Sequence, residues 1–297
     1  MDRIDQLRVF IRVAQSGGFT SAAEQLGLPR PTVSLAIQQL EARLGTRLFS
    51  RTTRRVGLTQ DGESLLERAI ALVADAEELE QQFRPRVLHG RLRVDMPSRI
   101  ARRLVAPALP RFFARHPGIE LELGSSDRAL DLVHEGIDCA LRVGELPASS
   151  LVARPLGPMR LINCASPAYL ARHGRPSSMA DLGGHLAVKY ASPSSGRVAP
   201  WQWCADGQVH TLALGGPVAV NNAETYIACC LAGLGLIQIP AFDVREHLLA
   251  GELVEVLAEW PPPAMPVSVV YPHRRQLPRR VRAFSDWLAE VLAPALA

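Results

Sequence analysis

Residues 22–40 read AAEQLGLPRPTVSLAIQQL, a pattern that predicts two short helices separated by a sharp turn. Gly27 has no Cβ, which suits a turn where a larger side chain would strain the backbone. Pro31 suits the first turn of a helix, because its φ angle is fixed and its missing N–H is not needed there. The second helix has an apolar face spaced by four, three and four residues, formed by Val33, Ile37, Leu40 and Leu44.

The opposite face of the second helix is polar and carries no acidic charge; it comprises Thr32, Ser34, Gln38 and Gln39. Such short hydroxyl and amide side chains suit the major groove of DNA, where they can read base edges. An ordinary helix pair in a small bundle could show the same pattern, so the flanking sequence is decisive. Residues 1–18 predict a preceding helix, and residues 48–59, LFSRTTRRVGLT, predict a short basic ribbon. A helix pair with a basic wing is much less common than a helix pair alone.

Several motifs in this region occur in a fixed order: SGGFT at 16–20, QQLEARLGTRLFSR at 38–51 and GLTQDGE at 57–63. With them, residues 1–60 resemble the winged helix-turn-helix of LysR-type transcriptional regulators. Two positions depart from the family pattern. Pro29 stands where the family often has Ser or Thr, so that side-chain cap is missing. Leu35 stands where a basic residue is frequent, so one DNA contact of the family is missing.

Positive charge is concentrated in the same region. Residues 1–60 hold nine arginines and four acidic residues, a net charge of +5, whereas the whole chain carries +4. This asymmetry favours double-stranded DNA as a partner, because phosphate binding requires basic groups. We expect base-edge contacts from Thr32, Ser34 and Gln38, and contacts to phosphates or the minor groove from Arg30, Arg51, Arg54 and Arg55.

A long helix is predicted to begin after Thr59, with Asp61 and Glu63 favourable in its first turn. Its apolar residues alternate spacings of four and three, which is a heptad seam: Leu65, Ala69, Leu72, Ala76, Leu79 and Phe83. A helix docked on its own domain could show this stripe, but its length and position between domains favour pairing with a second copy. The LysR resemblance implies the same dimer, and a homotetramer built from two such dimers.

Beyond residue 91 the pattern changes to alternating strands and helices, including a predicted helix at 129–135, a buried parallel strand at 137–143 and a loop at 144–157. We expect an α/β sensor of two subdomains, the arrangement of periplasmic binding proteins that the resemblance also implies. The expected boundaries are 1–58 for the DNA-binding domain, 59–88 for the linker helix and hinge, and 89–297 for the effector-binding domain. Within the last, subdomain I covers 91–160 and 266–297, and subdomain II covers 161–265.

In such sheets, ligands bind beyond the carboxyl ends of the strands, where helix N-termini favour a carboxylate. Three segments fall at these ends, and their polar residues are candidates for contact with a small-molecule effector: Ser98, Arg99, Ser149, Ser150, Asn221, Asn222 and Glu224. Each segment could instead only cap a helix. Arg142 is a possible counter-charge or a paired sheet residue. A ligand that changes the arrangement of subunits would change the DNA bend and the access of RNA polymerase.

Other classes of protein find little support in the sequence. No apolar run approaches the roughly 20 residues that span a bilayer, and the N-terminus lacks a signal-peptide core, so we expect no membrane partner and a cytoplasmic location. The five cysteines lack CxxC spacing, and no metal, cofactor or catalytic motif is evident. We therefore expect that the protein is not an enzyme and binds no cofactor. The alternative is a solute-binding module or enzyme with a helical N-terminal extension.

Overall fold

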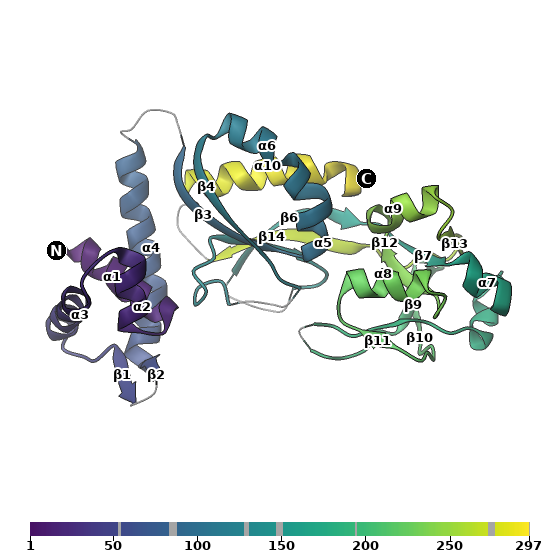
Figure 1. The fold of residues 1–297 in the computed structure, drawn as a ribbon, viewed down its shortest axis with the longest axis horizontal. Helices are drawn as coiled ribbons and strands as arrows, with labels where there is room; N and C mark the ends of the chain where they lie inside the picture. The colour runs from purple at the N-terminus through teal and green to yellow at the C-terminus, as the bar shows by residue number, and fades with distance from the viewer. Residues whose placement is uncertain are drawn as a thin grey trace.

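The computed structural model has a small N-terminal part, mostly helical, and a larger α/β part (Figure 1). It describes residues 1–296 except 53–54, 83–87, 128–130, 147–150, 194 and 273–276, and only the backbone at 51–52, 55, 74–75, 77–78 and 80–82. Within this described part, no helix is both long and apolar enough to cross a bilayer.

The N-terminal part is a winged helix-turn-helix followed by a long helix. Its elements are α1 (Arg3–Ser16), α2 (Phe19–Leu26), α3 (Arg30–Leu44), β1 (Phe49–Thr52), β2 (Arg55–Leu58) and α4 (Gln60–Gln82). Phe10 and Val13 of α1 are fully buried against α3, whose Val33, Ile37 and Leu40 lie in the core as predicted. The expectation for Leu44 is wrong: its side chain is 46% exposed, because it lies in the last turn before the Gly45 cap.

The ends of these helices follow from local sequence. Asp2 accepts a hydrogen bond from the Asp5 amide, which closes a capping box at the start of α1. Gly27 has φ 63° and ends α2, as the turn prediction requires. Thr59 Oγ1 accepts from the Gly62 amide at 3.1 Å, so the predicted cap of α4 is confirmed.

The first half of the α/β part is built on a five-stranded sheet of order β4-β3-β5-β14-β6. Its strands are β3 (His89–Met96), β4 (Gly118–Ser125), β5 (Cys139–Val143), β6 (Leu151–Met159) and β14 (Met265–Pro272). Strands β4 and β5 pair with β3 in parallel, whereas β14 pairs antiparallel with β5 and β6. The helical segments are α5 (Ser98–Ile100), a π-helical stretch (Ala101–Val105), α6 (Ala106–Arg115) and α10 (Arg279–Leu296).

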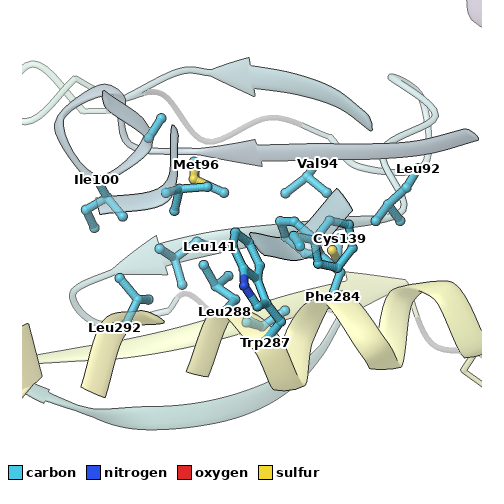
Figure 2. Close-up of a cluster of buried hydrophobic side chains, with 14 of the residues drawn as sticks. Leu92, Val94, Met96, Ile100, Cys139, Leu141, Phe284, Trp287, Leu288 and Leu292 are labelled. Atoms are coloured by element: carbon cyan, nitrogen blue, oxygen red, sulfur yellow. The ribbon is translucent and has the colours of Figure 1, made fainter. Parts of the chain in front are cut away.

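The main core of this half lies between the sheet and helices α6 and α10 (Figure 2). Phe112 of α6 packs edge-on against Phe284 of α10, with ring centroids 5.4 Å apart. Leu92 and Leu141 come from β3 and β5 and are fully buried. The last helix therefore returns to the first half of the domain.

The second half of the α/β part spans residues 161–255. Its elements are β7 (Leu161–Ala165), α7 (Pro167–His173), a 3₁₀ helix (Met179–Gly184), β8 (Lys189–Tyr190), β9 (Trp201–Ala205), β10 (Gln208–Leu212), β11 (Ala219–Val220), α8 (Ala223–Leu231), β12 (Ile237–Pro240), α9 (Ala241–Leu249) and β13 (Val254–Glu255). Strand β7 is central in the sheet β12-β7-β13, and both neighbours run antiparallel to it. Cys139 and Cys164 are buried free thiols, and all five cysteines are free.

Two expectations for the first half are wrong. The loop expected at 144–157 contains strand β6, which tolerates Pro155 and Pro158 because it lies at the edge of the sheet. The helix expected at 129–135 lies partly outside the described residues, and residues 132–136 form turns. There the Asp131 carboxylate accepts from the Val133 and His134 amides at 3.0 Å, a local bond that competes with a helix.

Candidate DNA-binding and effector-binding sites

Helix α3 presents a polar surface on the side away from the core. Val33, Ala36, Ile37 and Leu40 are at most 2% exposed. Of the residues expected to contact DNA, Arg30 and Gln38 are exposed, and Thr32 and Ser34 are half-buried. Pro29 is the N-cap and makes no side-chain hydrogen bond, as expected from the sequence. Leu35 is 54% exposed on this helix, so an apolar side chain lies where the family often has a basic one.

The wing is a two-stranded antiparallel ribbon held against the end of α3. The Glu41 carboxylate accepts from the Leu48 amide at 2.8 Å and the Phe49 amide at 3.3 Å, which fixes where β1 begins. Arg51 and Arg55 lie on β1 and β2, and Arg54 lies outside the described residues. Their roles toward DNA stay predictions.

The heptad seam of α4 divides into two parts. Ala69 is 2% exposed and belongs to the core of the N-terminal part, and Leu65 packs against that core. Leu72 and Leu79 are 51% and 58% exposed, with Ala76 half-buried between them. Phe83 lies outside the described residues. The first two seam residues thus pack within their own chain, and the later positions are those available to a second copy.

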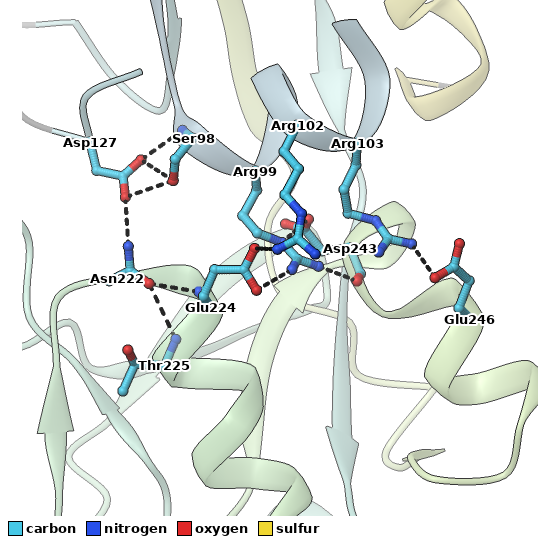
Figure 3. Close-up of polar contacts among 10 residues, drawn as sticks. All are labelled: Ser98, Arg99, Arg102, Arg103, Asp127, Asn222, Glu224, Thr225, Asp243 and Glu246. Carbon is cyan, nitrogen blue, oxygen red and sulfur yellow. Dashed lines mark hydrogen bonds and ion pairs between the residues drawn. The ribbon is translucent and has the colours of Figure 1, made fainter. Parts of the chain in front are cut away.

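A network of charged side chains joins the two halves of the α/β part (Figure 3). Arg99 of α5 is 6% exposed; its Nε donates to Asp243 Oδ1 at 2.8 Å and its Nη2 to the Asp243 carbonyl at 2.6 Å. Its Nη1 donates to Glu224 Oε2 at 2.6 Å, and Arg102 binds the other Glu224 oxygen at 2.8 Å. Since Glu224 and Asp243 lie on α8 and α9, these bonds cross between the halves.

A second set of polar contacts lies beside Arg99 and converges on Asp127, which follows β4. Ser98 donates to the Asp127 carboxylate through its amide at 3.2 Å and through its Oγ at 3.4 Å. Asn222 Nδ2 approaches the same carboxylate at 3.4 Å, while its Oδ1 caps α8 by accepting from the Glu224 and Thr225 amides. Three donors from both halves therefore surround one carboxylate. We name Ser98, Arg99, Asp127, Asn222, Glu224 and Asp243 the junction network.

Electrostatics explain why the junction network is charged. Burial disfavours the charged form of Arg99, but its bonds to Glu224 and its attraction to Asp243 outweigh burial and raise the pKa of the guanidinium. The hydrogen bond from Arg99 and the nearby charge of Arg102 lower the pKa of Glu224 below its ordinary value. A buried guanidinium with two carboxylate partners stays charged, and it holds both halves through charge-assisted bonds.

The other predicted effector residues differ in their surroundings. Asn221 is exposed, and Ser149 and Ser150 lie outside the described residues. Arg142 is the paired sheet residue of the two alternatives, since its Nη1 donates to buried Asp95 at 2.8 Å. Asp127 and Asp243 were not among the predicted effector residues, because neither lies in a recognisable motif.

Comparison with known proteins now identifies the family. A model described as "Bacterial regulatory helix-turn-helix protein, lysR family" matches residues 4–63, and one described as "LysR substrate binding domain" matches residues 85–293. The chain belongs to the LysR family of transcriptional regulators. LysR-type regulators bind DNA and small-molecule effectors and form oligomers; they are not enzymes. The resemblance found in the sequence and the fold class expected from it are confirmed.

Similar proteins cover nearly the whole length of this LysR-type regulator. The HTH-type transcriptional regulator YhjC of Escherichia coli is 44% identical over 98% of each chain. An HTH-type transcriptional repressor of Pseudomonas aeruginosa is 38% identical over 99% of this chain and 93% of its own. The structure of CrgA, a LysR-type transcriptional regulator from Neisseria meningitidis, is 34% identical over 96% and 97% of the two chains, with a TM-score of 0.60. ArgP from Mycobacterium tuberculosis shares the fold at 19% identity and a TM-score of 0.68.

Proposed function

We propose that this LysR-type regulator senses a carboxylate at the junction network and transmits its presence to a DNA-bound dimer. The proposal assigns DNA binding to residues 1–58, dimerisation to 59–88 and effector binding to 89–297, with subdomain I at 91–160 and 266–297 and subdomain II at 161–265. In this scheme the effector changes the spacing of the two recognition helices in the dimer. The spacing sets the DNA bend, and so the access of RNA polymerase to DNA.

The observation that carries the effector proposal is the position of Asp127. Its carboxylate is held by the Ser98 amide, the Ser98 hydroxyl and the Asn222 side chain, so these donors already bind a carboxylate inside the protein. An effector carboxylate can take the same donors if Asp127 turns away. Because Ser98 and Asn222 belong to different halves, such an exchange would alter how the halves are joined.

Chemical rescue tests this proposal with acetate as the simplest carboxylate. Asp127→Ala leaves the three donors without their carboxylate, and we expect its melting temperature to fall. Acetate should then raise the melting temperature of Asp127→Ala more than that of the wild type, with chloride at equal ionic strength as the reference. Asp286→Ala, which removes an exposed carboxylate paired with Arg154, is the matched control and should gain nothing. An equal response of all three proteins would exclude these donors as the carboxylate site.

The DNA-contact proposal rests on the exposed polar face of α3 and on the basic wing. We assign base edges to Thr32, Ser34 and Gln38, and phosphates or the minor groove to Arg30, Arg51, Arg54 and Arg55. Arg30→Ala should weaken binding to all sequences and lower the slope of log affinity against log salt by about one contact. Ser34→Ala should instead relax specificity at one position. Gel shifts from low to moderate salt, with Arg111→Ala on α6 as the control, separate the two effects.

A further inference from the structure

A second polar site lies where the helix-turn-helix meets the α/β part. A pocket of about 440 Å³ is lined by Arg12 and Gln15 of α1, Gln25 of α2, Arg91 and Arg93 of β3, and Glu135. The two parts touch beside it, since Val133 packs against the core of the N-terminal part. The pocket therefore belongs to both parts of the chain, and it is separate from the junction network.

The lining carries more positive charge than its partners offset. Arg91 and Arg93 share the single carboxylate of Glu122, and Arg93 Nη1 donates to the Glu135 carbonyl at 2.9 Å. In the described part of the chain, Arg12 has no ion pair; its Nη1 has a contact of 3.4 Å with Gln25 Oε1. The lining thus holds three guanidinium groups and one carboxylate, that of Glu135, and Glu122 pairs with Arg91 and Arg93 from outside it. Two carboxylates leave one of the three positive charges without an offsetting negative charge.

Arg12 is partly buried and lies near the like charges of Arg91 and Arg93. Burial lowers the pKa of its guanidinium, and the like charges of Arg91 and Arg93 lower it further. Like charges held together in a partly buried place repel one another, and a bound anion relieves that repulsion. Guanidinium groups bind phosphate oxygens through paired hydrogen bonds, and the two glutamine amides can add further donors.

We propose that the pocket lined by Arg12, Gln15, Gln25, Arg91, Arg93 and Glu135 binds a small phosphate-type oxyanion, either inorganic phosphate or a phosphate monoester, on its arginine side. The ligand contacts the DNA-binding part and the α/β part at once, so it stabilises the docked arrangement of the two. Double-stranded DNA is a poor occupant, because α3, the helix proposed to read DNA, lies on the side of the N-terminal part away from β3 (Figure 1).

Isothermal titration of the full-length protein with inorganic phosphate, at an ionic strength fixed with sodium chloride and without DNA, tests the site. We expect one saturable site per chain. Arg12→Gln should weaken it about tenfold or more, the range for a hydrogen bond to a charged group. Gln25→Glu should also weaken it, because a carboxylate then lies beside Arg12. Residue 25 is exposed, so this second variant is expected to fold.

Arg111→Gln is the matched control, since it removes one exposed arginine of α6 outside the pocket. It should leave the phosphate affinity unchanged. Absence of saturable binding in the wild type would overturn the proposal. Binding that Arg12→Gln and Gln25→Glu leave unchanged would also overturn it, because the phosphate would then lie elsewhere, such as on the DNA-binding face. A titration with glycerol phosphate separates a free phosphate site from one that admits a monoester.

Discussion

Arg99 is a buried cation whose two carboxylate partners both lie in the other half of the α/β part. Glu224 reaches it from the start of α8 and Asp243 from the start of α9. Removing one partner of a buried pair costs more than the pair contributes on balance, because the remaining charge loses its compensation. Single substitutions of Glu224 or Asp243 therefore measure how much their bonds to Arg99 stabilise the joined halves.

Asp243→Asn should lower the free energy of unfolding of the α/β part by about 1–3 kcal/mol, because a neutral amide replaces the charge-assisted partner of Arg99. Urea unfolding followed by tryptophan fluorescence measures this, since all four tryptophans lie beyond residue 200. Glu246→Gln is the control on the same helix: its carboxylate also pairs across the halves, with Arg103, but its side chain is 74% exposed, so the unfolding midpoint should shift less than for Asp243→Asn. Equal midpoints for Asp243→Asn and the wild type would contradict the account.

Glu224 makes the junction sensitive to acid. The hydrogen bond from Arg99 lowers its pKa below the ordinary value of 4.5. A carboxylate with a lowered folded-state pKa stabilises the folded protein above its unfolded pKa and loses this effect as pH falls through the folded pKa. Glu224→Gln should therefore melt below the wild type at pH 7, and the difference should shrink as pH falls below the ordinary value of 4.5. Melting curves from pH 8 to pH 3.5 measure it; a difference independent of pH would exclude titration of Glu224 as the cause.

The helices and strands show what sequence alone can predict and where it fails. Amphipathic spacing located α3, because burial of Val33 and Ile37 on one face is a local property of a helix. Strand β6 escaped detection, because its prolines resemble a loop and only the sheet edge makes them acceptable. The sequence pointed to only part of the junction network: Ser98, Arg99, Asn222 and Glu224 lie at helix starts, where local rules apply. Asp243 is more than a hundred residues from Arg99, so only the fold brings them together.

Helix α4 is the element that carries the dimer prediction. Leu72 and Leu79 are exposed in the single chain, and a second copy would bury both on a shared seam. Leu72→Glu and Leu79→Glu together should convert the oligomer to a smaller species, because a carboxylate in an apolar seam would be desolvated without a partner. Light scattering after size exclusion measures the mass. Arg68→Glu, exposed on the same helix but off the seam, should keep the wild-type mass; an unchanged mass for the double variant would place the interface elsewhere.

At the scale of the whole molecule, the DNA-binding part and the α/β part are in direct contact in one chain. Val133 packs on the core of the N-terminal part, and Gly136, with φ 65°, lies so close to Gln15 that a Cβ there would reach the glutamine side chain at 2.5 Å. The pocket lined by Arg12, Arg91 and Arg93 opens beside this contact. Under the proposed function, this contact gives an effector signal a route from the α/β part to the helix-turn-helix in addition to α4.

Val133→Asp tests whether this docking is stable in solution. A carboxylate placed against an apolar core loses its hydration without gaining a partner, so the variant should favour separation of the two parts. Amide hydrogen exchange should then rise in α1 and in β3, the two elements that meet at the contact. His134→Asp introduces the same charge at the neighbouring exposed position and should leave exchange as in the wild type. If amide hydrogen exchange in α1 and β3 were the same in Val133→Asp as in the wild type, the contact would not stabilise the docking of the two parts. The regulator would then transmit its signal through α4 alone.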